Sequence, residues 1–489
     1  MNAPHGTFFF FWRQMNTSYL AGLIFFLAFA GMILVHELGH FLAARLFGIE
    51  VEEFGFGLPP RALVFWRLKG YFLTRSGKRI EIPQDFGLPF LWSELVKREL
   101  TLTVDYVDNK TLLRTIDMVE ETSEKNSQGG SLATGQILVD GNGNVLPPQE
   151  TSAVARKTTQ IGKLRGTQEL VETIAEAHPG TEFTLNWLPV GGFVRPKGEN
   201  DPNVPGGLAA ANPWKRLGVL FAGPIMNLLT GVILITVLFM QIGAPNYHIV
   251  TIADVSPGSP AEQAGFKVGD IVRSVNGQEI TGSNQLQQII RASFDQPLTF
   301  VFQRGEETVT ITATPSSKRS QREGALGFIM SPLFEPVSSW FETVGPAFRQ
   351  AYNEIDFLLS IPGMIMDRVI TAEEARPVGL KGIFDMVNES LRRDTASREA
   401  SPASAEQPTF WTLQLMISLT ISIGLINLFP FPALDGGRII FAIPEIVFRR
   451  RVPHQFENAI HAAGMILLLL LMLYVNVMDF VNPIVIPTP

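Results

Sequence analysis

The sequence contains no cysteine and only seven histidines among its 489 residues. The lack of cysteine excludes disulfide bridges and thiolate metal sites, so a metal ion must be held by histidine, aspartate or glutamate. Charged residues are also scarce, at 17% of the chain. Because 46 acidic residues outnumber 39 basic ones, which gives a net charge of −7, the balance argues against a nucleic-acid partner.

Charge is missing altogether from several long apolar stretches. No charged residue occurs between Tyr19 and Val35, for example. Four apolar runs are long enough to cross about 30 Å of hydrocarbon at about 1.5 Å per residue. They cover residues 18–47, 217–242, 410–434 and 456–478. The sequence therefore predicts a polytopic α-helical membrane protein with about four transmembrane helices, surrounded by a lipid bilayer.

The short loops beside these runs predict how the chain is oriented. Arg449–Arg451 lie between the third and fourth runs, and Lys215 and Arg216 precede the second run. Positive charge in short loops marks the cytoplasmic side, which places the segment between the second and third runs outside the cell. We therefore expect a multi-pass protein of the plasma (inner) membrane. The ends of the first and third runs then lie at the same depth, near the cytoplasm.

The first apolar run contains a candidate metal site, His36-Glu37-Leu38-Gly39-His40. Residues four apart share one face of a helix, so His36 and His40 can bind one Zn²⁺ while Glu37 polarises a water molecule. Ionisable residues inside a membrane are costly and indicate function. The alternative is a buried helix whose histidines are satisfied by neighbouring groups. The spacing favours half of a hydrolytic zinc site.

A hydrolytic zinc ion normally has a third protein ligand. Asp435 is the best candidate, because Pro430 and Pro432 break the third apolar run just before it and let the carboxylate turn inward. Apart from the first pair, His461 is the histidine that lies in or near an apolar run. The alternative for Asp435 is a turn residue that ends a helix at the lipid headgroups.

These features divide the chain into six segments. They are a first transmembrane helix with the zinc motif and a re-entrant β-hairpin (1–68), an inserted, PDZ-like α+β segment in the cytoplasm (69–186), a returning strand and second helix (187–245), a PDZ domain (246–332), amphipathic helices and a linker (333–408), and the last two helices with the third ligand (409–489). In the insertion we expect a helix at 168–174 followed by a strand. The alternative for the re-entrant hairpin is an ordinary hairpin on the cytoplasmic surface.

A PDZ domain is indicated by residues 256–277, which closely resemble the start of bacterial members, and by a groove helix expected at 285–291. Leu326, Gly327 and Phe328 resemble the loop that takes a peptide carboxylate through backbone N–H groups. Two roles are compatible with this pattern. The domain either binds peptide ends or acts as a bulky filter outside the membrane.

The chain as a whole resembles the site-2 protease family of intramembrane zinc metalloproteases, and within it the bacterial regulator-of-sigma-E type. The resemblance rests on residues 36–40, 188–194, 223–227, 377–379 and 427–437, together with the extracytoplasmic PDZ domain. It implies one Zn²⁺ per chain, bound by His36, His40 and Asp435. It also implies that Glu37 is the general base and acid.

The same resemblance implies how a substrate is held. Asn227 and Asn427 would hold it, and a re-entrant β-loop containing Phe54, Phe56 and Gly57 would accept it as an added strand. The implied substrates are transmembrane proteins shortened by an earlier cut, as in regulated intramembrane proteolysis of an anti-sigma factor or a signal-peptide remnant. The expected function is therefore that of an intramembrane zinc endopeptidase.

Two other functions are compatible with parts of the sequence. The first is an inactive membrane adaptor whose PDZ domain binds partner tails, and the second is a zincin that is tethered to the membrane and cleaves soluble substrates. The intact set of His36, Glu37, His40 and Asp435 argues against the adaptor. The position of the histidines inside an apolar run argues against the tethered zincin.

Overall fold

The computed structural model describes residues 17–84, 95, 97–107, 110–118, 167–178, 180–199, 201–318, 324–400 and 410–483. The chain forms two compact units. One comprises Ile33–Gly223 and Ile439–Gln455, and the other comprises Met1–Met32, Pro224–Arg438 and Phe456–Pro489. Each unit contains some of the residues that the sequence assigns to the active site.

Among the described residues, three helices are long and apolar enough to cross a membrane: α2 (Thr17–Leu46), α5 (Pro213–Ile242) and α12 (His454–Val481). The sequence predicts a fourth span at 410–434, but the helix found there, α10 (Trp411–Asn427), has only 17 residues. At 1.5 Å per residue it is about 25 Å long. Pro430 and Pro432 account for the early end, since residues just before a proline avoid helical geometry.

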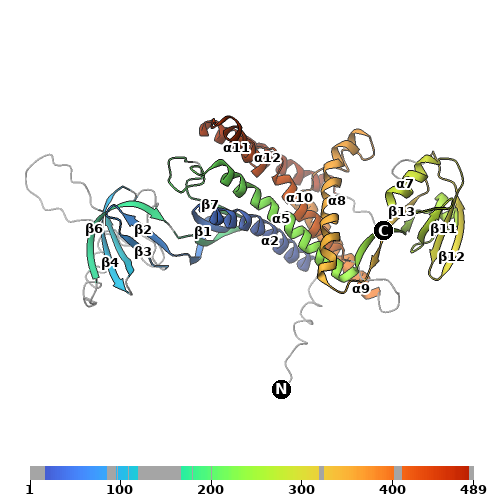
Figure 1. The fold of residues 1–489 in the computed structure, drawn as a ribbon, viewed down its shortest axis with the longest axis horizontal. Coiled ribbons are helices and arrows are strands. Elements are labelled where there is room, and N and C mark those ends of the chain that lie inside the picture. The colour runs from blue at the N-terminus through green and yellow to red at the C-terminus, as the bar shows by residue number, and fades with distance from the viewer. Residues whose placement is uncertain are drawn as a thin grey trace, which may run out of the picture. The chain divides into compact units, whose positions relative to one another are not determined.

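Two long strands of the first unit, β1 (Val51–Arg67) and β7 (Glu182–Pro196), each fold back on themselves and pair with each other (Figure 1). Phe54 pairs with Val194 on one side and with Phe183 on the other. The order across the sheet is therefore 61–67, 182–186, 51–56 and 192–196. The early part of β1 lies in the interior of the sheet, and the end of β7 lies at its edge.

A closed five-stranded barrel follows β1 in the same unit and corresponds to the inserted segment (blue to green strands in Figure 1). Its strands, in the order in which they pair, are β2 (Gly70–Thr74), β3 (Arg79–Ile82), β5 (Lys110–Met118), β4 (Glu99–Val107) and β6 (Thr167–His178). Alternate residues of the strands point inward, and Phe72, Ile80, Leu102 and Val104 are fully buried at its centre.

This barrel differs from the PDZ-like α+β segment that the sequence predicts. The expected helix at 168–174 is part of strand β6, in which residues 167–173 pair with β4 and residues 174–178 pair with β2. The spacing of Leu170, Val171 and Ile174 suits one face of a helix, but pairing with the neighbouring strands determines the conformation. Residues 119–166 of the insertion lie outside the described residues.

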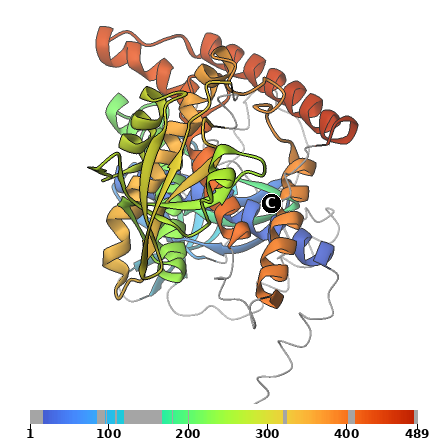
Figure 2. The same ribbon diagram turned by 90° about the vertical axis from the view of Figure 1, so that its right-hand side faces the viewer.

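A second β domain, between Ala244 and Glu335, belongs to the other unit (green to yellow in Figures 1 and 2). Its strands are β8 (Ala244–Val255), β9 (Ile271–Val275), β10 (Gln278–Glu279), β11 (Leu298–Arg304), β12 (Glu307–Ala313) and β13 (Phe328–Glu335), and its helices are α6 (Pro260–Ala264) and α7 (Ser283–Ala292). The sheet runs β12-β11-β9-β8-β13. Phe266, Phe300 and Phe302 pack edge to face or stacked in the core. This is a PDZ-like arrangement.

The remaining helices are α8 (Trp340–Met366), α9 (Leu380–Ala400) and α11 (Asp435–Phe448). Ala347 and Ala351 of α8 pack against α5 and α10 in one apolar cluster with Ile235 and Ile421. This amphipathic helix of the 333–408 segment thus packs through small residues, while Phe348 and Tyr352 are exposed. The linker expected at the end of the 333–408 segment lies partly beyond α9, and residues 401–408 are outside the described residues.

Candidate metal centre

His36 and His40 lie one turn apart on α2, and their Nε2 atoms are 3.2 Å apart. Two nitrogens bonded to one tetrahedral zinc ion at about 2.0–2.1 Å stand about 3.3–3.4 Å apart. The two rings therefore already have the spacing that a shared zinc ion requires. His36 is buried, with 8% of its surface exposed, so water competes little for this position.

The orientation of the His40 ring is fixed by α5. Its Nδ1–H donates a hydrogen bond to the carbonyl oxygen of Val219, at 2.8 Å. A histidine that donates from one ring nitrogen presents the lone pair of the other, which is how metal ligands are oriented in proteins. The contact thus leaves Nε2 of His40 as the ligand atom.

Two glycines leave room for the functional side chains. A Cβ atom at Gly223 of α5 would lie 2.6 Å from Cε1 of His40 and 2.9 Å from Cε1 of His36. A Cβ atom at Gly192 of β7 would lie 3.4 Å from Cγ of Glu37. The edge of the sheet therefore passes beside Glu37, and no side chain at Gly223 blocks the imidazoles. The residues present fit a zinc ion.

Asp435 begins α11, directly after a tight turn. Gly436 and Gly437 make this turn possible, because a Cβ atom at either position would overlap the carbonyl groups of Phe429 and Phe431. Ala433 adopts a left-handed conformation with φ of 78°. Asp435 belongs to the unit that does not contain the two histidines.

The two asparagines assigned to substrate binding lie on neighbouring helices of the same unit. Asn227 of α5 is fully buried, and its carbonyl oxygen accepts a bond from the Thr420 hydroxyl of α10 at 3.4 Å. The side-chain amide of Asn427 donates to the carbonyl oxygen of Ile423, one turn earlier in α10. Close packing at Gly424 brings these two helices together, since a Cβ there would lie 3.2 Å from that of Asn227.

The residues expected to receive a substrate strand are not at an edge. Phe54 and Phe56 pair with β7 on both sides, and the carbonyl oxygen of Gly57 accepts a hydrogen bond from the amide of Asn186. A backbone that is paired on both sides has no groups left for a third strand. The prediction of this loop as the acceptor is therefore wrong. The edge at 192–196, which sequence reasoning missed, is the neighbouring strand that can accept one.

The groove of the PDZ-like domain contains the predicted loop residues. A cavity of 490 Å³ is lined by Gln287 and Arg291 of α7 and by Leu326, Gly327 and Phe328. The carbonyl oxygens of Leu326 and Gly327 accept bonds from the backbone N–H groups of Ala261 and Ser256. Because the N–H and C=O of one trans peptide point in opposite directions, the N–H groups of Gly327 and Phe328 point away from those donors.

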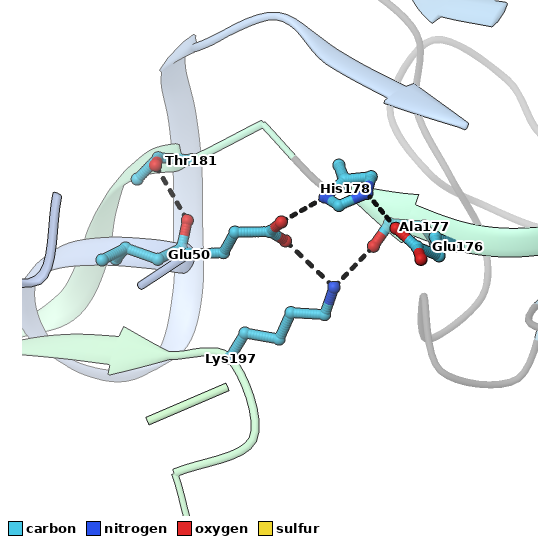
Figure 3. A network of polar contacts seen from close by, with 7 residues as sticks. Glu50, Glu176, Ala177, His178, Thr181 and Lys197 are labelled. Carbon is cyan, nitrogen blue, oxygen red and sulfur yellow. Dashed lines mark hydrogen bonds and ion pairs between the residues drawn. The ribbon is translucent and has the colours of Figure 1, made fainter. Parts of the chain in front are cut away.

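A polar cluster joins the barrel to the start of β1 (Figure 3). One carboxylate oxygen of Glu50 contacts Nδ1 of His178, and the other accepts a bond from Nζ of Lys197 at 3.0 Å. The same ammonium group donates to the carbonyl oxygen of Ala177 at 2.6 Å. Sequence reasoning missed this cluster because Glu50 is more than 100 residues from His178 and Lys197, and the three share no spacing pattern.

Comparison with known proteins identifies relatives over most of the chain. The family model described as Peptidase family M50 matches residues 24–73 and 169–471. Zinc metalloprotease RasP of Geobacillus kaustophilus is 25% identical, with 92% of this chain and 96% of the relative covered. The protein named "Probable protease eep" of Enterococcus faecalis is 25% identical, with 93% and 97% covered. Metalloprotease MmpA of Caulobacter vibrioides is 27% identical, with 60% and 81% covered.

One solved structure, the PDZ domain of an SdrC-like protein from Listeria monocytogenes, covers 17% of this chain and 88% of its own at 15% identity and a TM-score of 0.16.

Proposed function

The chain belongs to peptidase family M50, and from this premise we propose that it cleaves peptide bonds in or near the transmembrane segments of membrane proteins that an earlier cut has shortened. It is a zinc metalloendopeptidase, and zinc is its cofactor. Its apolar helices mark it as a membrane protein. The observation that carries the proposal is the pair of imidazole nitrogens 3.2 Å apart on a helix apolar enough to cross a bilayer.

We propose His36, His40 and Asp435 as the three protein ligands. Each offers one ligand atom, and together they supply two imidazole nitrogens and one carboxylate oxygen. Three such ligands with one open position are what a hydrolytic zinc centre uses. A zinc ion held by these residues would supply a Lewis acid for the scissile carbonyl and would make water a stronger nucleophile at neutral pH.

Glu37 then carries the proton in the proposed mechanism. Its side chain lies beside Gly192 at the sheet edge, where a substrate strand would pass. The carboxylate takes a proton from the attacking water and delivers it to the amine of the leaving peptide. Asn227 and Asn427 are proposed to hold the substrate backbone during this transfer.

A transmembrane helix satisfies all its backbone hydrogen bonds internally and resists attack, so it must unwind against a partner that replaces them. The end of β7, residues 192–196, supplies such a partner because it is the strand beyond 51–56 in the sheet. Addition of a substrate strand here places the scissile bond beside Glu37. We propose this edge as the acceptor, with the active site near the cytoplasmic side and the PDZ-like domain outside the inner membrane.

The test is Glu37→Gln in the full-length chain, assayed with a transmembrane reporter in liposomes or detergent. The variant keeps the size of the side chain but cannot accept a proton, so we expect cleavage to fall by at least about 100-fold while zinc content is unchanged. The matched control is Glu52→Gln, a nearby glutamate on β1 that has no assigned role. A Glu37→Gln variant that cleaves at the normal rate would exclude the proposed mechanism.

A further inference from the structure

We propose that α12 positions Asp435 for metal binding, by holding both ends of the chain segment that runs from α10 to the start of α11. His461 holds the end next to Asp435, and Asp479 holds the other end through α9. The inference rests on the proposed function, because it takes Asp435 to be the third ligand.

The near end of the segment contacts α12 directly. The backbone N–H of Ala433 donates to Nδ1 of His461 at 2.9 Å. A Cβ atom at Gly464 would lie 2.7 Å from the carbonyl oxygen of Pro432, so α12 approaches the turn as closely as a backbone can. The left-handed conformation of Ala433 is unfavourable for a residue with a Cβ atom. Such a conformation persists only where the surroundings hold it, and here Asp435 follows two residues later.

The far end of the segment, at the start of α10, is linked to α12 through α9. The first link is a buried carboxylate of α12. Asp479 is 1% exposed, and one of its oxygens accepts bonds from the N–H groups of Gly379 and Gly382, both at 2.9 Å. These two donors lie at the start of α9. Glycine is needed at both positions, because a Cβ atom at either would lie 2.8 Å from that oxygen. Arg376, 3.6 Å from the other oxygen, balances the charge. The N-terminus of α9 is thus fixed to α12.

A second buried carboxylate, on α9, fixes the start of α10. Asp394 lies near the other end of α9 and is 6% exposed. Its two oxygens accept bonds from the N–H groups of Trp411 and Thr412, at 2.7 Å and 3.0 Å. These are the first residues of α10, whose N–H groups have no partner within their own helix. Helix α9 therefore holds the start of α10.

The contacts form a closed circuit from α12 through α9 and α10 to the turn before Asp435, and back to α12. An axial shift of α10 by one residue, about 1.5 Å, would break the two hydrogen bonds that Asp394 accepts from the start of α10. Loss of hydrogen bonds to a buried carboxylate is unfavourable. Metal ligands must be held to within about 0.5 Å, so a circuit that prevents this sliding serves zinc binding and not only folding.

The experiment measures zinc affinity by chelator competition in the full-length protein, together with its unfolding temperature in detergent. His461→Leu removes the acceptor for Ala433, and His461→Gln retains an acceptor. Asp394→Asn and Asp479→Asn remove the buried charges. Asp385→Asn is the matched control, because Asp385 lies on α9, is 44% exposed and pairs only on the surface with Lys381. Asp435→Ala is the reference for loss of a ligand.

We expect His461→Leu, Asp394→Asn and Asp479→Asn to lower zinc affinity about 10- to 100-fold, as loss of supporting contacts does at other metal sites. His461→Gln should retain affinity within about threefold, and Asp385→Asn should equal the parent protein. If the three variants bind zinc like the parent while Asp435→Ala loses it, the inference is overturned. If Asp435→Ala itself retains zinc with unchanged affinity, the proposed ligand set fails instead.

Discussion

At the scale of single residues, the metal centre depends on the lack of a side chain at Gly223 as much as on the ligands. The imidazoles of His36 and His40 lie where a side chain at Gly223 would have to be. The carbonyl oxygen of Val219, one turn earlier on α5, fixes which nitrogen of His40 is available. A helix with a larger residue at position 223 would displace both rings.

We predict that Gly223→Ala lowers zinc affinity about tenfold or more, because overpacking costs about 1–3 kcal/mol and tenfold corresponds to about 1.4 kcal/mol. Chelator competition measures the change. Gly345→Ala is the control, since a Cβ atom at that helical glycine of α8 has no neighbour within 4 Å. Equal zinc affinity in the Gly223→Ala variant and the parent would show that the rings do not occupy this space when zinc binds.

Residue spacing alone identified His36, Glu37 and His40, because a helix has a fixed period and a pair four apart must share a face. It did not identify Gly223 or Val219, which lie more than 170 residues away. No local pattern marks a glycine as the neighbour of a distant histidine. Such a contact follows only once two helices are packed together.

At the scale of elements, strands β4 to β6 show how pairing overrides a local pattern. The segment at 168–174 has the apolar spacing of a helix, yet it is an interior strand of the barrel. Strand pairing in the barrel also brings two acidic side chains close together. Burial raises the pKa of the Asp117 carboxyl on β5, and the Glu169 carboxylate on β6 raises it further.

This raised pKa predicts a pH dependence of barrel stability. The pKa of this carboxyl is higher in the folded state than its unfolded value of 3.8. The folded barrel therefore loses stability as the pH rises from the unfolded pKa through the folded pKa. Because the raised pKa makes this carboxyl increasingly unfavourable for the folded state as pH rises above 3.8, Asp117→Asn should slow amide hydrogen exchange in β4–β6 at pH 7, and the difference should shrink towards pH 4.

The control variant for Asp117→Asn is Asp105→Asn. Asp105 pairs with Arg114 at 2.8 Å on the same barrel, so its loss should leave exchange unchanged or faster at pH 7. The gain in protection should therefore be specific to Asp117. Faster exchange in Asp117→Asn at pH 7 would contradict the pH dependence proposed for this pair.

At the scale of the whole molecule, the family model covers the barrel only in part, because it leaves residues 74–168 unmatched. Strands β3, β4 and β5 lie in this unmatched stretch, whereas most of β2 and β6 lies in matched residues. The two ends of the barrel segment meet, because the backbone N–H of Leu68 donates to the carbonyl oxygen of Thr181 at 2.9 Å. Insertions whose ends are adjacent can be removed with little disturbance of the host fold.

We predict that replacing residues 70–179 with a short Gly-Ser linker preserves zinc content and keeps cleavage of a short transmembrane reporter within about tenfold, as expected for an inserted domain. The unfolding temperature should fall, because Glu50 and Lys197 lose their contacts with His178 and Ala177. The same deletion combined with Glu37→Gln controls for other proteases. Loss of zinc in a deletion variant that retains its helices would show that the barrel supports the metal centre.

The sequence by itself determined the zinc motif, the apolar helices α2, α5 and α12, and the class of enzyme, because each follows from helical periodicity, hydropathy or a short motif. Tertiary structure alone decided that the insertion is a barrel, that Phe54 and Phe56 lie inside a sheet while 192–196 forms its edge, and that α12 contacts the turn before Asp435. The physical reason is distance along the chain. Local sequence sets the period of a segment, whereas pairing and packing between remote segments decide what that segment touches.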